Sequence, residues 1–188
     1  MIDTLKTIER EQILNILSQP IEKFKTLYVD YEHPYVERLQ FNLEDGHRIF
    51  FHVIHECKTE QALYHPHPWP SAMHVLKGIY ETGLSYSEID EHYKHTETGE
   101  LNSIIAKNEV AKLIIGHNAY GSAYYEMLNP KGWHYVRPIT TCHTVMLTHT
   151  PWYSGNKATK PLVPLTDERA NEIKEWFLQW YTNHRPLL

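Results

Sequence analysis

Histidine and tyrosine side chains dominate the reactive chemistry that this 188-residue chain can offer, with 14 His and 13 Tyr. Both residue types serve as neutral ligands, proton carriers or polar aromatic walls. The densest stretch runs from Tyr64 to Ser71, where His65 and His67 alternate with prolines. Side chains two residues apart in an extended chain point to one face, so both imidazoles can bind a single metal ion. The alternative is a solvated His-Pro loop, because an H-x-H pair is expected by chance at this histidine frequency.

The residues that follow this pair resemble the first motif of the cupin superfamily. That motif runs H-x-H, then an acidic residue, then a glycine. His65, His67 and Gly78 fall on the corresponding positions, and Ser71 stands where the family has its acidic ligand. The resemblance implies a cupin-like double-stranded β-helix, or jelly-roll, barrel with the two histidines as metal ligands.

A second cupin motif, P-x-G-x-x-H, is approximated by Pro130 to His134 and is one residue short. The resemblance covers about residues 35–152 and implies that His134 is the third metal ligand. Three imidazoles leave the full charge on a divalent metal, so its open positions favour an anionic co-ligand such as a thiolate or enolate.

Within the cupins, this ligand set resembles the thiol dioxygenases of the cysteine dioxygenase type. The segments Leu76–Thr82 and Gly132–Val136 are similar to the family's sequence around its ligands. The resemblance implies Fe(II) as the cofactor, with O2 and a small thiol acid, or a similar anionic small molecule, as reactants. A three-histidine site also accepts Mn, Ni, Cu or Zn.

The same family carries an arginine that pairs with the substrate carboxylate. Arg38 lies 27 residues before the first histidine of the pair, close to the family's spacing. A planar guanidinium can hold a carboxylate bidentately. Alternatively, Arg38 pairs with Glu37 or Glu44 on a solvated strand, and Arg48 is a rival. Arg137 faces the opposite side of a regular strand from the third histidine, which favours a structural role.

A phenol near the metal could come from Tyr124, Tyr125, Tyr135 or Tyr153, and we take Tyr135 as the candidate catalytic tyrosine. The mammalian-type enzyme has a crosslinked cysteine near the position of Ser71 and a serine-histidine-tyrosine trio. This sequence has neither a cysteine there nor a clear match for that tyrosine, so the substrate stays open.

Three further histidines, His52, His55 and His74, are interpreted separately. His74 is expected to end a buried strand, with a role behind the metal ligands as the alternative. His52 and His55 fall on opposite faces of one strand, so they cannot share a metal.

Composition narrows the class of partner. The formal charge of -5, the pI near 6.3 and the absence of any basic cluster predict no nucleic-acid partner. No stretch approaches 18 apolar residues and no signal peptide begins the chain, so we expect a cytoplasmic protein without a membrane partner. Cys57 and Cys142 are expected to be free thiols.

The elements that must position these residues form one expected domain, 1–188. It consists of an N-terminal helical segment at 1–27, a β-barrel at 35–152 and a C-terminal helix at 165–183. Asp3 or Thr4 can cap the first helix, and 21–27 add a short second one. Thr166 caps the last helix, whose aromatic stripe is expected to be core. Glu88–Gly99 reads as a surface hairpin loop. Strands are expected at Arg48–Cys57, Val75–Tyr86 (two runs), Ala111–Ile115, Ala123–Leu128, Trp133–Ile139 and His143–Thr148.

The sequence therefore predicts a metal-dependent cupin, a mononuclear non-haem Fe(II) dioxygenase. The alternatives are a metal- or small-ligand-binding cupin without redox activity (sensor, storage or isomerase-like), and a structural protein that forms a homodimer through its terminal helix.

Overall fold

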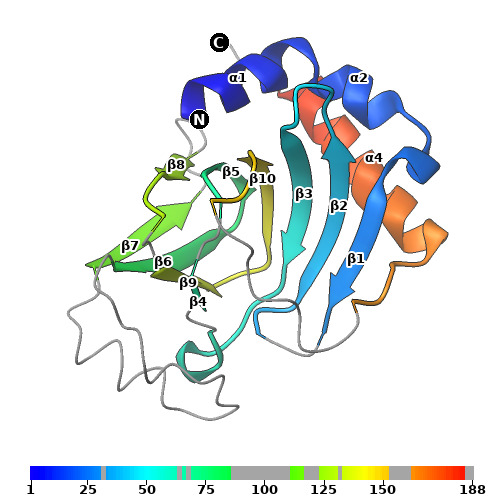
Figure 1. Cartoon of the computed structure of the whole chain (residues 1–188). Helices are drawn as coiled ribbons and strands as arrows, with labels where there is room; N and C mark the ends of the chain where they lie inside the picture. Colours follow the sequence, from blue (N-terminus) through cyan, green and yellow to red (C-terminus); the bar gives the residue numbers. More distant parts are fainter. Residues whose placement is uncertain are drawn as a thin grey trace.

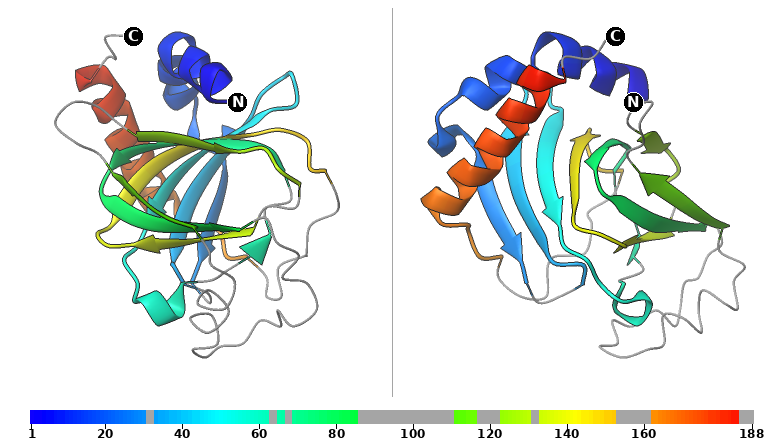
Figure 2. Two further views of the ribbon diagram at one scale, coloured as in Figure 1. Left: turned by 90° about the vertical axis from the view of Figure 1, so that its left-hand side faces the viewer. Right: turned by 180° about the vertical axis from the view of Figure 1, so that it is seen from behind.

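The structure is a computed structural model that describes residues 1–30, 33–62, 65–66, 69–85, 111–116, 123–130, 133–152 and 162–184. Two antiparallel sheets face each other, and the helices lie outside the larger one (Figures 1 and 2). The Glu88–Gly99 hairpin expected from the sequence lies outside the described residues. No helix in the described part of the chain is long and apolar enough to cross a membrane.

Eight strands make a jelly roll. They are β3 (Arg48–Ile54), β4 (His65–Pro66), β5 (Ser71–Lys77), β6 (Ile79–Ser85), β7 (Ala111–Gly116), β8 (Ala123–Met127), β9 (Trp133–Pro138) and β10 (Cys142–Thr148). The orders β3-β10-β5-β8 and β4-β9-β6-β7 are those of a double-sheet jelly roll, an architecture that cupins share. The cupin-like fold class with flanking helices is therefore confirmed. The two sheets stay separate among the described strands and do not close into the continuous barrel that was expected.

Two more strands widen the first sheet to six. β1 (Lys25–Val29) pairs with β2 (Val36–Asn42), and β2 pairs with β3, all antiparallel. The predicted second helix over 21–27 is wrong, because Ile21–Lys23 forms only a single 3-10 turn before β1 begins. Pairing along the whole of β1 with β2 satisfies the backbone of this segment better than a short isolated helix could.

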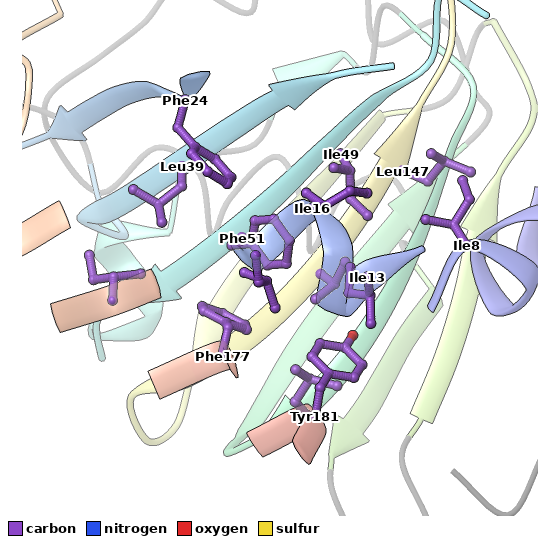
Figure 3. Packing of buried hydrophobic residues seen from close by; sticks show 14 of the residues in the cluster. Ile8, Ile13, Ile16, Phe24, Leu39, Ile49, Phe51, Leu147, Phe177 and Tyr181 are labelled. Atoms are coloured by element: carbon purple, nitrogen blue, oxygen red, sulfur yellow. The ribbon is translucent and has the colours of Figure 1, made fainter. Parts of the chain in front are cut away.

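Helices α1 (Ile2–Glu11), α2 (Ile13–Ser18) and α4 (Asp167–Asn183) cover one face of the six-stranded sheet. Figure 3 shows their apolar side chains meeting those of the strands. The expected core stripe of the last helix is confirmed, since Phe177 and Tyr181 are 0% and 1% exposed. The expected Thr166 cap is also present, because its side chain accepts from the backbone N–H of Arg169 at 3.2 Å. The first helix instead begins at Ile2, with no side-chain cap.

β3 shows why both faces of this sheet matter. Ile49 and Phe51 point to the helices, whereas Phe50 and Ile54 point to the smaller sheet, and six of its seven residues are buried. A strand buried on both faces reads as a continuous apolar run without alternation. We call the helix-covered side of the six-stranded sheet the outer face. The opposite side, which faces the smaller sheet, is the inner face. It carries Arg38, Arg48, Phe50, His52, Ile54, Ser71, Met73, Val75, Tyr125, Thr144, Met146 and Thr148.

A glycine turn joins β5 to β6. Gly78 has φ +90°, and a Cβ there would lie 2.7 Å from both the Thr141 carbonyl oxygen and the Cys142 Sγ. Only glycine fits such a position without strain. This turn carries the chain from the larger sheet to the smaller one, which holds the histidines.

Candidate metal centre

Two of the three predicted ligands come together in the smaller sheet. β4 pairs with β9 so that His65 lies directly opposite His134. Their Nε2 atoms are 3.0 Å apart, and their ring centroids are 4.5 Å apart. β9 lies between β4 and β6, and His134 is 5% exposed. Strand pairing therefore positions two imidazoles that are 69 residues apart in sequence.

This spacing fits a shared metal ion. Two nitrogens that each lie about 2.1 Å from one ion, on adjacent coordination positions, are about 3.0 Å apart. Imidazole suits Fe, Zn, Cu and Ni, so the donor set agrees with the expected cofactors. His67 lies outside the described residues, and those that are described contain no group of three or more His, Cys, Asp or Glu that could hold a metal.

His134 faces the larger sheet. Val136, two residues along β9 and so on the same side, packs with Ile54 and Val75 of that sheet. Val136 also lies opposite Thr82, as His134 lies opposite Leu84. The ligand pair therefore points between the two sheets.

Tyr135 points the other way. Its hydroxyl donates to Glu81 Oε1 at 2.6 Å, and its ring lies where a side chain at Gly83 would be. Burial, with help from the Glu81 carboxylate, raises the pKa of Tyr135. Arg137 lies on this same side, 3.4 Å from Glu81 Oε2, which agrees with its expected structural role. Because adjacent strand residues face opposite sides, we remove Tyr135 from the candidate site.

The other three candidate tyrosines differ in where they lie. Tyr125 lies on the inner face opposite Met73, beside Phe50, and burial raises its pKa to about 12. Tyr124 lies on the outer face and donates to Glu9 Oε2 at 2.7 Å. Tyr153 lies outside the described residues. Tyr125 is therefore the tyrosine of this set whose ring reaches the space between the sheets.

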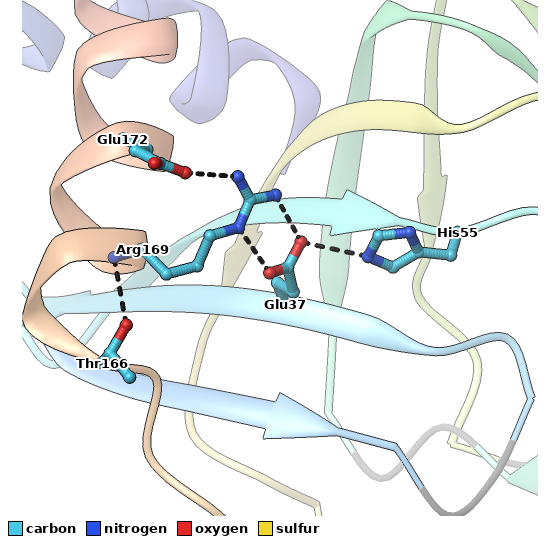
Figure 4. Close-up of polar contacts among 5 residues, drawn as sticks. All are labelled: Glu37, His55, Thr166, Arg169 and Glu172. Carbon is cyan, nitrogen blue, oxygen red and sulfur yellow. Dashed lines mark hydrogen bonds and ion pairs between the residues drawn. The ribbon is translucent and has the colours of Figure 1, made fainter.

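Arg38 lies on the inner face, opposite His52. Its Cζ is 5.2 Å from the ring centroid of Phe50. The neighbouring Glu37 lies on the outer face, where Arg169 holds its carboxylate through two hydrogen bonds of 2.6 and 2.7 Å (Figure 4). Strand alternation thus places Arg38 where a molecule between the sheets can meet it.

Arg48 shares that face. Its Cζ lies 5.8 Å from the Phe50 ring centroid and 5.2 Å from that of Trp69, and its Nη2 donates to the His149 carbonyl oxygen at 3.3 Å. Burial lowers the pKa of Arg48. The sequence left Arg38 and Arg48 as rivals, whereas the structure brings both to the same phenyl ring.

His52 and His55 lie on opposite faces, as the sequence predicted. Burial, followed by the nearby Arg38 charge, lowers the pKa of His52 to about 3, so this imidazole is neutral near pH 7. Its Nδ1 is 3.3 Å from the Thr144 hydroxyl oxygen. On the outer side, His55 Nε2 is 3.0 Å from Glu37 Oε2.

A buried polar cluster on the outer face was missed by sequence reasoning. Glu9 lies on α1, and its carboxylate accepts hydrogen bonds from the hydroxyl groups of Tyr181, at 2.5 Å, and Tyr124. Its Oε1 also lies 2.5 Å from His74 Nδ1. Glu9 is 2% exposed. His74 therefore binds the helices to the sheet and does not stand behind the metal ligands. In the sequence, the only sign of this cluster was that the charged residue Glu9 falls on the apolar side of the first helix.

The site is thus a histidine pair on the smaller sheet of a jelly roll, and the inner face of the larger sheet carries two arginines. No family model matches the sequence, and no curated protein is similar to it. Among solved structures, the Fe(II) form of HppE is 7% identical, with 69% of this chain and 58% of that chain covered and a TM-score of 0.47. Hydroxypropylphosphonic acid epoxidase from S. wedmorenis is 9% identical, with 69% and 57% covered and a TM-score of 0.44.

A third similar structure is HEPD from Streptomyces albus, with 2-hydroxyethylphosphonate and Fe(II) bound. It is 10% identical, with 72% of this chain and 26% of that chain covered and a TM-score of 0.45. The chain thus spans less than two thirds of the length of each of these three proteins. Likenesses this distant carry no argument about activity, which must come from the site itself.

Proposed function

We propose that this chain is a metal-dependent cupin in which His65, His67 and His134 hold one Fe(II) ion, and that it acts as a dioxygenase on a small thiol acid. The observation that carries the proposal is the 3.0 Å separation of the His65 and His134 Nε2 atoms, contributed by two different strands. A ligand set of neutral imidazoles favours a metal that takes an anionic co-ligand.

When bound, the metal would supply the one-electron chemistry that lets O2 react with a thiolate. The overall reaction balances without another reductant, because a thiolate and one O2 give a sulfinate. Two sulfur–oxygen bonds form, the O–O bond breaks, and the sulfur loses four electrons to the two oxygen atoms. The protein residues therefore have to bind, orient and shield the substrate.

The inner face supplies those functions. Arg38 would hold the substrate carboxylate, since a guanidinium offers paired donors in a fixed plane. The apolar side chains of Phe50, Met73 and Met146 pack together there and would limit the entry of water to the reacting atoms. His52 stays neutral near pH 7 and so leaves the arginine charge as the local attraction for an anion.

The test is metal analysis followed by oxygen uptake. Protein loaded anaerobically with Fe(II) should bind one equivalent of iron, and O2 consumption should depend on a thiol acid and yield its sulfinate. His134→Ala should lose at least nine-tenths of the iron, whereas His55→Ala, with its imidazole on the outer face, should keep it. Iron retained by His134→Ala would refute the site.

The second candidate is a metal- or ligand-binding cupin without redox turnover. The specific observation in its favour is that the inner face places Arg38 and Arg48 beside the apolar ring of Phe50, an arrangement that suits the binding of an anion without demanding a reaction. One equivalent of metal, with no thiol-dependent O2 uptake across a panel of thiol acids, would establish this function in place of the first.

A further inference from the structure

Arg48 is a half-buried cation at the start of β3, and the described part of the chain supplies an acceptor for only one of its N–H groups. Its Nη2 donates to the His149 carbonyl oxygen at 3.3 Å, and its Cζ lies 5.2 Å from the centroid of the Trp69 ring. A guanidinium carries five N–H donors, so most of them remain for another molecule. No Asp or Glu among the described residues forms an ion pair with Arg48, so its charge is not neutralised there.

Asn42 lies directly opposite Arg48, across the antiparallel pair of β2 and β3. Side chains in this relation share one face of the sheet, with Cβ atoms about 4.5–5.5 Å apart. Gln40 Nε2 donates to Asn42 Oδ1 at 2.9 Å, which leaves the two N–H donors of the Asn42 amide for another acceptor. Because Asn42 is exposed and Arg48 is half-buried, a ligand can reach both side chains from solvent.

The row of hydrogen-bond donors continues onto the next strand. Thr148 of β10 lies opposite Arg48, and its buried hydroxyl has no hydrogen-bond partner among the described residues. The nearest acids in sequence are Glu44 and Asp45, and Asp45 Oδ2 lies 2.9 Å from His47 Nδ1. Neither of these two carboxylates forms an ion pair with Arg48. Donors gathered around an unneutralised positive charge attract an anion.

This row lies at the same end of the jelly roll as the histidine pair. Ser71, the first residue of β5, lies opposite Thr148. The Gly78 turn joins the end of β5 to the beginning of β6, so the start of β5 and the end of β6 lie at one end of the fold. Leu84, near the end of β6, lies opposite His134. An anion on this row is therefore bound at the end of the larger sheet that corresponds to the histidines.

We propose that Arg48 and Asn42 bind the carboxylate of a small organic acid, which accepts hydrogen bonds from the guanidinium and from the Asn42 amide. Bonds from a guanidinium to a carboxylate are charge-assisted and are stronger than bonds between neutral groups. An organic acid is favoured over an inorganic anion, because the half-buried ring of Trp69 beside Arg48 offers an apolar contact for its hydrocarbon part. The site uses no metal and does not involve Arg38, so it is independent of the proposed function.

An NMR titration of the full chain, dialysed against a chelator, tests this site with propionate, propionamide and phosphate at constant ionic strength. Propionate should bind at least about tenfold more tightly than propionamide, which has a similar shape but no charge. The resonances of the Arg48 Nε–H and of the Asn42 side-chain amide should shift as propionate binds. Tighter binding of phosphate than of propionate would overturn the assignment to a carboxylate.

Three variants complete the test. Arg48→Met should abolish the preference for propionate, and Asn42→Asp should weaken propionate binding at least about tenfold, because it places a like charge beside the ligand. Arg10→Met, which removes one exposed positive charge from α1, should bind propionate as the native protein does.

Folding of each variant is checked by near-ultraviolet circular dichroism. Should Arg48→Met not fold, Asn42→Asp carries the test, since Asn42 is exposed. Equal affinities for propionate and propionamide in the native protein, or an unchanged affinity for propionate in the folded Arg48→Met or Asn42→Asp variant, would overturn the proposal.

Discussion

The buried Glu9 cluster permits a quantitative test of how the helices are held to the sheet. In Tyr181→Phe, Glu9 Oε1 loses one of its two short hydrogen bonds, while the ring and its packing remain. A hydrogen bond to a charged group contributes about 1.5–3 kcal/mol, and Tyr181 is almost fully buried, so we expect a loss of about 2 kcal/mol. For a chain of this size, Tm should fall by about 4–8 °C.

Tyr124→Phe is the matched control. Its hydroxyl also donates to Glu9, at 2.7 Å, but Tyr124 is only half-buried, so water can replace the lost donor. We expect a loss of about 1 kcal/mol or less. Urea unfolding followed by circular dichroism gives both free energies, and equal m-values show that the unfolded states are comparable.

A double-mutant cycle with Glu9→Leu completes the test. If the hydroxyl acts through this carboxylate, Tyr181→Phe should cost much less in the Glu9→Leu background, giving a coupling energy of about 1–2 kcal/mol. A loss under about 0.5 kcal/mol for Tyr181→Phe in the native background, or a coupling energy near zero, would show that this bond does not stabilise the helix packing.

Three other predictions concern stability. Although burial raises it, Arg169 and His55 hold the pKa of Glu37 below its usual range. The stability that Arg169→Met removes should therefore be present at neutral pH and shrink as pH falls through the lowered pKa, measured by urea unfolding from pH 7 to 3. A pH-independent difference would contradict the ion pair. Because the pKa of buried His52 is about 3, the unfolded chain takes up a proton below about pH 6.5 and the folded chain does not. The native protein should lose stability relative to a folded His52→Gln variant between about pH 6.5 and 3; parallel pH profiles would refute this. Thr166→Ala removes the N-cap of α4 and should cost about 1 kcal/mol, whereas Thr166→Ser should cost little; equal losses would show that the hydroxyl is not the cap.

Much of the architecture could be predicted from local patterns. The last helix has an apolar stripe at helical spacing and a threonine at its start, both of which act within a few residues. Most jelly-roll strands were located within one to four residues of their ends, because β-formers alternate with glycine and proline turns. Residues 25–27 were wrongly assigned to a helix, since the strand conformation of β1 depends on pairing with β2, which no local pattern contains.

The candidate site was likewise predicted from the sequence only in part. Residue type and spacing alone singled out His65, His67 and His134 as candidate ligands. Only tertiary structure brought His65 opposite His134, because the register between β4 and β9 is set by long-range backbone pairing. The alternation of side chains along each strand likewise points Tyr135 away from the histidine pair and places Arg38 and Arg48 beside the ring of Phe50. Which face of a strand becomes the inner face is decided by what packs on each side, and this information lies in residues far away along the chain.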